Sequence, residues 1–116
     1  METNPATQDP ATPARTGACP FCARKHLLRA RGYAREVAED PTREWERDNL
    51  MENLMLAEDH FAALGDTATL AEVQSIRHAA EVGENVATPV AGLYDRFKKI
   101  YFATPSLKRN EPRGEF

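Results

Sequence analysis

The chain has 116 residues, of which 41% are hydrophobic and 28% charged, and its formal net charge is −3. This length suits one small domain rather than two, and the slightly acidic total gives no general attraction to nucleic acid, although a local basic face can still bind it. No segment approaches ~18 consecutive apolar residues, which excludes a transmembrane helix. The N-terminal stretch METNPATQDPATPARTG has no apolar run and is not a secretory signal.

The chain divides into one patterned region between two arms. Residues 1–17 are rich in Pro, Thr, Ala and Asn without periodic apolar spacing, and they predict a flexible N-terminal arm. Residues 104–116 contain two prolines and a glycine and predict a flexible tail. Residues 18–103 carry four helical patterns and no strand alternation. The sequence therefore predicts an all-α fold, a small bundle of about four helices whose short joints make neighbours antiparallel.

The first two helices are predicted from their end signals. The first runs from Pro20, a residue favoured in the first helical turn, to about Ala38. On a helical wheel one of its faces carries Cys19, Cys22, His26, Ala30, Tyr33, Ala34 and Val37. The second begins at Asp40-Pro41-Thr42 and ends at Leu64, where Gly65 can adopt the left-handed conformation that stops helices. Its apolar arc contains Trp45, Leu50, Leu54, Leu56, Ala57, Phe61 and Leu64.

The last two helices are shorter. The third is predicted to begin near Thr69, because Thr69-x-x-Glu72 has the spacing of a capping box, and to stop before Gly83. The fourth opens at Thr88-Pro89, and its apolar face consists of Val90, Leu93, Tyr94, Phe97, Ile100 and Tyr101. We interpret the aromatic residues of this segment as core, with a dimer or partner interface as the alternative; they are Tyr94, Phe97, Tyr101 and Phe102.

Two cysteines and a histidine lie within eight residues at the start of the first helix. Cys19, Cys22 and His26 are spaced i, i+3 and i+7, so they point to one side, and thiolates with imidazole suit zinc. A structural site needs a fourth ligand. If the first two helices fold back near Asp40, residue n faces about 81 − n, which brings His60 within about one turn of both cysteines. His60 also belongs to the apolar arc. The sequence therefore predicts a structural zinc site at Cys19, Cys22, His26 and His60.

Such a site has consequences for function. Four protein ligands leave no open coordination position, so this zinc is structural and the protein is expected to be a non-enzymatic interaction or assembly protein with a protein partner or a second copy. Asn49 and Asn53 share the arc of His60 and need partners if buried. Two cysteines so close together cannot build a disulfide framework, and a reducing cytoplasm is the expected compartment.

The spacing of Cys19, Cys22 and His26 also resembles the CxxCxxxH core of the AhpD-like alkylhydroperoxidases, which are all-helical thiol enzymes. The resemblance implies an alternative function as a thiol peroxidase or disulfide reductase. Cys22 would be the attacking thiol, Cys19 the resolving thiol and His26 the proton relay. That family adds an acidic relay residue in a preceding helical segment, whereas only a low-complexity arm precedes Cys19 here.

A second resemblance covers about residues 19–80. The pattern CxxCxxKH, an Asp-Pro joint, Trp45 and the step Ala57-Glu58-Asp59 are similar to small uncharacterised phage and bacterial helical proteins. This implies no specific activity, but it does imply an accessory or virion-associated protein.

Three further interpretations stay open at this stage. The cysteines and His26 can be plain core side chains. A basic side of the first helix can bind nucleic acid or pair with acidic residues; it consists of Arg24, Lys25, Arg29, Arg31 and Arg35. The acidic residues of the second helix are predicted to form a solvated face rather than a di-iron site; they are Asp48, Glu52, Glu58 and Asp59. His78 is predicted to be exposed.

Overall fold

A computed structural model describes residues 19–104, and in this part of the chain it contains helices and no strand. The helices are α2 (Pro20–Glu39), α3 (Glu44–Leu64), α4 (Thr67–Glu81) and α5 (Ala87–Ala103). The predicted small all-α bundle is confirmed. The predicted arms lie outside the described residues, apart from Thr104.

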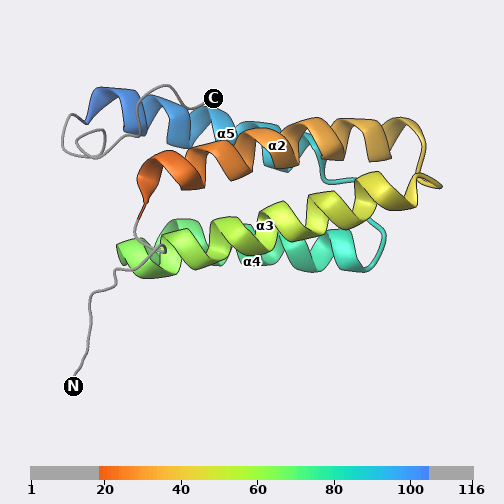
Figure 1. Cartoon of the computed structure of the whole chain (residues 1–116), viewed down its shortest axis with the longest axis horizontal. Helices are drawn as coiled ribbons and strands as arrows, with labels where there is room; N and C mark the ends of the chain where they lie inside the picture. The colour runs from red at the N-terminus through yellow and green to blue at the C-terminus, as the bar shows by residue number, and fades with distance from the viewer. Residues whose placement is uncertain (1–18, 105–116) are drawn as a thin grey trace, which may run out of the picture.

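The helices form two layers. α2 and α5 lie side by side in one layer, and α3 and α4 lie side by side in the other (Figure 1). The core fills the space between the layers, where Phe61 of α3 meets Phe97 of α5 edge to face with 4.9 Å between ring centroids. Each large apolar side chain buried there contributes roughly 1.5–3 kcal/mol. The largest fully buried side chains are Tyr101, Phe61, Leu27, Leu50, Leu54, Val73 and Val90.

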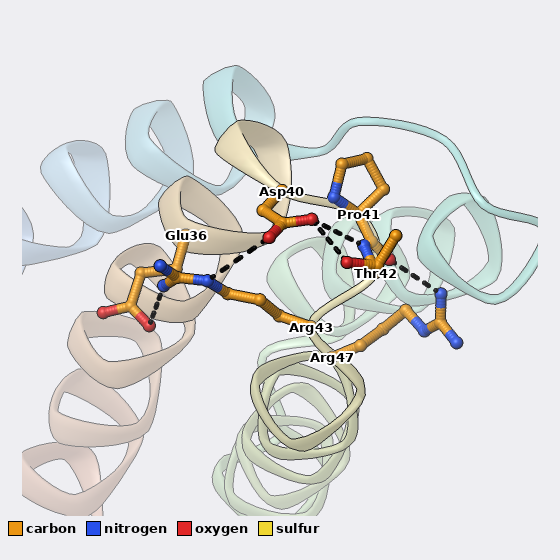
Figure 2. Close-up of polar contacts among 6 residues, drawn as sticks. All are labelled: Glu36, Asp40, Pro41, Thr42, Arg43 and Arg47. Atoms are coloured by element: carbon orange, nitrogen blue, oxygen red, sulfur yellow. Dashed lines mark hydrogen bonds and ion pairs between the residues drawn. The ribbon is translucent and has the colours of Figure 1, made fainter.

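The joint between α2 and α3 differs from the prediction. Asp40-Pro41-Thr42 does not begin the second helix. The Asp40 carboxylate instead accepts hydrogen bonds from the backbone N–H of Thr42 at 3.1 Å and from its hydroxyl at 2.6 Å (Figure 2). Asp side chains commonly bond their own backbone two residues on, which makes a turn and not a helix start. Arg43 is the N-cap of α3, and its guanidinium pairs with both Asp40 and Glu36.

The start of α4 also differs from the prediction. Asp66 is the N-cap, and its carboxylate accepts hydrogen bonds from the backbone N–H and the hydroxyl of Thr69. Thr69 is therefore a donor to the cap and not the cap itself. Glu72 pairs across to Arg96 of α5 instead of closing a capping box. Gly65 has the expected left-handed φ of 76° and ends α3.

The buried face of α2 is rotated from the predicted one. Its buried residues are Phe21, Ala23, Leu27, Ala30 and Ala34. The cysteines, His26 and Tyr33 lie half-buried at the edge towards α3, because α2 is packed between α3 and α5 and each neighbour covers one flank.

Three predicted core residues are exposed. Trp45 is 64% exposed and touches the edge of Tyr33, with 5.8 Å between ring centroids. Ile100 is 53% exposed and Phe102 is 49% exposed, so the interpretation of Phe102 as core is wrong. Trp45 and Ile100 lie on the apolar sides of their helices but beyond the stripe that the neighbouring helices cover.

The outer face of α3 is acidic as predicted, with one exception. Glu58 is not solvated, because it pairs with Arg77 of α4 and its side chain is only 13% exposed. His78, the residue after Arg77, is exposed as predicted. Within residues 19–104, the helices are too short or too polar to cross a membrane.

Candidate metal centre

The four side chains predicted to bind zinc come from helix ends that meet at one end of the bundle. α2 begins where α3 ends, as the orange and green ends of these helices show in Figure 1. Cys19 is the N-cap residue of α2, Cys22 follows in its first turn and His26 one turn later. His60 lies near the C-terminal end of α3. The antiparallel pairing of α2 and α3 thus places them at the same end of the molecule.

The two cysteines are neighbouring free thiols. The backbone N–H of Cys22 donates to Cys19 Sγ at 3.1 Å, so the first cysteine caps the helix that carries the second. Burial raises the pKa of the Cys22 thiol to about 11, and a hydrogen bond to the Cys19 side chain adds to this shift. Without a bound cation, Cys22 is therefore a protonated thiol at neutral pH. A metal ion changes this, because a coordinating thiol is deprotonated outright.

A chain of hydrogen bonds fixes the proton on His26. Asn53 directs its amide NH₂ to the carbonyl oxygen of Asn49 at 2.8 Å, and that oxygen can only accept. Asn53 Oδ1 must then be the atom that meets His26 Nδ1 at 3.0 Å, and it also accepts. Nδ1 therefore carries the hydrogen, which leaves the lone pair of the neutral ring on Nε2. Burial lowers the pKa of His26, which keeps the ring neutral at pH 7.

His60 is buried, with 8% of its surface exposed, as its place on the apolar arc predicts. Its ring lies next to that of His26, with 5.4 Å between centroids and 19° between planes. Two imidazoles that bind one tetrahedral zinc through nitrogens at about 2.0–2.1 Å have ring centres roughly 5 Å apart, so the spacing of this pair suits a shared ion. The near-parallel ring planes do not suit a shared ion. One of the two rings has to turn before a nitrogen of each ring points at the same position.

The structure thus brings the predicted ligands together as two pairs. Cys19 contacts Cys22, and His26 contacts His60. Within residues 19–104, no three His, Cys, Asp or Glu side chains are arranged so that they could already hold a metal ion. To bind one ion, these half-buried and buried side chains would have to move from the positions that they hold here.

Sequence reasoning missed the role of Asn53. Its position in the same arc as His60 showed that its side chain needs a hydrogen-bond partner if it is buried. It is buried, with 6% of its surface exposed. The identity of that partner depends on the register between α2 and α3 to within one residue, which an approximate hairpin rule does not supply.

Comparison of the chain with protein-family models, with curated proteins and with solved structures finds no match. The functional argument therefore depends on the residues of this chain.

Proposed function

We propose that this protein is a small, non-enzymatic helical assembly module whose fold is held together by a structural zinc bound to Cys19, Cys22, His26 and His60. The observation that carries the proposal is the pair of neighbouring histidines, half-buried His26 and buried His60, in which Asn53 leaves Nε2 of His26 as the atom with a lone pair. Histidines that bind metal commonly donate their other ring N–H to an oxygen in this way, which fixes the ring and its tautomer.

The chemistry of the four donors favours zinc. Two thiolates and two neutral imidazoles match the ligand softness and tetrahedral geometry of structural zinc sites. With four protein ligands the ion has no open position, so its role is to stabilise the fold. The raised pKa of Cys22 further supports this proposal over the thiol peroxidase alternative, because an attacking cysteine must be a thiolate at neutral pH.

The position of the site explains why the fold would use it. The cysteines precede and open α2, so the site would fix the first turn of α2 to the end of α3. Small domains bury a limited core and commonly add a metal as a further constraint. Two free cysteines so close together also fit a reducing compartment, and we propose the cytoplasm.

The first prediction concerns metal content. Protein purified without added metal is expected to carry about one zinc per chain, and a strong chelator is expected to lower its melting temperature by more than about 10 °C. His60→Ala and Cys22→Ser should each lose the zinc. His78→Ala removes an exposed histidine outside the cluster and is the matched control, which should keep both zinc and melting temperature.

Reduced wild-type protein that carries no zinc and melts at the same temperature with and without chelator would contradict the proposal. If the protein consumes peroxide in a thiol-dependent reaction, and Cys22→Ser abolishes this activity without loss of fold, the thiol peroxidase alternative would be the correct function.

A further inference from the structure

Charge is divided between the two layers of the bundle. α2 and α5 together carry eight basic and three acidic side chains, whereas α3 and α4 carry two basic and eight acidic ones. The layers lie on opposite sides of the core (Figure 1). The molecule therefore has a basic side and an acidic side.

A stripe on α2 concentrates the basic charge along the seam with α5. The α2 stripe consists of Arg24, Leu28, Arg31 and Arg35. The guanidinium of Arg24 lies 5.2 Å from the ring centroids of both Tyr101 and Phe102, and that of Arg31 lies 4.8 Å from the ring of Tyr94. Stacking on rings holds these cations in place without neutralising them.

The arginines of the α2 stripe lack acidic partners in the part of the chain that the structure describes. No ion pair joins Arg24, Arg31 or Arg35 to a carboxylate within residues 19–104. Nε of Arg24 is buried and makes no hydrogen bond there. The α2 stripe therefore presents guanidinium groups that a carboxylate of another molecule can bind.

A second stripe of opposite charge runs along the outer face of α3. The α3 stripe consists of Asp48, Glu52, Met55 and Asp59, all exposed. Its three carboxylates take part in no ion pair among the described residues. Met55 is 52% exposed, and the apolar residue of the other stripe, Leu28, is 38% exposed.

The two stripes match residue by residue when they run antiparallel. Position 24 then faces 59, 28 faces 55, 31 faces 52 and 35 faces 48, and each pair of numbers adds to 83. Three of these pairs join an arginine to a carboxylate, and the fourth joins Leu28 to Met55. The match extends over roughly 16 Å of helix, three turns. Within one molecule the α2 stripe borders α5 and the α3 stripe lies on the exposed face of α3, and no ion pair joins the two stripes among the described residues.

We infer that the partner of this module is a second copy of the chain, whose α3 stripe docks antiparallel on the α2 stripe. This inference depends on the proposed assembly role and names its partner. Because each copy offers one stripe of each sign in different layers, the contact is head-to-tail and leaves a free stripe at both ends. Association is therefore expected to continue beyond a dimer as concentration rises.

Sedimentation velocity of the full chain tests this with two charge-reversed variants. Arg31→Glu/Arg35→Glu disables the α2 stripe, and Asp48→Lys/Glu52→Lys disables the α3 stripe. Wild type is expected to associate between about 10 μM and about 1 mM, and less in about 0.5 M salt than in about 0.05 M. Each variant alone should need a protein concentration about tenfold or more above that of wild type to associate to the same extent. An equal mixture should associate again, because each variant keeps the stripe that the other lacks.

Controls make the result specific. Lys99→Glu and Glu84→Lys reverse exposed charges outside both stripes and should behave as wild type. Circular dichroism checks the fold, and the α3 variant keeps the test valid if the loss of ring contacts unfolds the α2 variant.

Zinc is measured in every sample. A chain that associates without zinc overturns the zinc proposal alone, and a zinc-bound chain that stays monomeric overturns this inference alone.

Two other outcomes would contradict self-association. In the first, charge reversal in the α3 stripe leaves association unchanged. In the second, wild-type protein stays monomeric and binds a labelled single-stranded oligonucleotide, and only the α2 variant loses this binding. The second outcome would make the α2 stripe a nucleic-acid site.

Discussion

At the scale of single residues, the most informative side chain is Asn53. It is a buried amide whose NH₂ meets a carbonyl of its own helix and whose oxygen meets His26. This arrangement sets the tautomer of a residue on the neighbouring helix. It gives half-buried His26 a defined lone pair, which is the property a metal ligand needs.

A second prediction follows for Asn53. Asn53→Ala should weaken zinc binding by about 10–100-fold, because ring orientation and tautomer are no longer fixed. Asn49→Ala is the matched control, since the Asn49 side chain bonds only the carbonyl of Trp45 in the described part of the chain and its backbone carbonyl remains. Competition with a zinc chelator measures both. Equal affinity in the Asn53 variant and wild type would show that this hydrogen bond has no part in metal binding.

At the scale of elements, local signals identified the helices and missed how they meet. Gly65 and the inward position of His60 follow from backbone chemistry and periodicity within one helix, and both were predicted. The N-caps of α3 and α4 were predicted wrongly, at Asp40 and Thr69 instead of Arg43 and Asp66, because several nearby polar residues could cap and only the backbone path selects among them. The rings around Arg24 and the exposure of Trp45 depend on where α5 lies against α2, and no local pattern encodes that.

The joint between α2 and α3 gives a pH prediction. The side-chain hydrogen bond from Thr42 lowers the pKa of Asp40, so this carboxylate stabilises the folded state above its ordinary pKa and loses that contribution as pH falls through the folded value. Thr42→Val removes the hydroxyl and keeps the backbone N–H. The pKa of Asp40, followed by carboxyl NMR, should rise part of the way to its ordinary value, and acid unfolding should begin at a higher pH.

Thr88→Val, an exposed threonine at the start of α5, is the control and should leave the titration of Asp40 unchanged. An unchanged pKa in Thr42→Val would mean that the turn in Figure 2 does not hold in solution.

At the scale of the whole molecule, the proposed metal centre and the proposed docking stripes would have separate roles in a small assembly module. The proposed zinc lies at one end and would fix the helix ends, while the stripes run along the outer surfaces of α2 and α3. Arg24 belongs to the α2 stripe and lies two residues before His26, so the N-terminal part of α2 has to be ordered for both. We expect the zinc to support assembly by ordering this end of α2.

The central claim is that two thiolates and two imidazoles bind one ion. Zinc K-edge X-ray absorption of the purified, reduced protein measures this ligand set directly. The expected result is two sulfur ligands at about 2.3 Å and two nitrogen ligands at about 2.0–2.1 Å. A zinc shell that contains only oxygen and nitrogen, with no sulfur, would contradict the account.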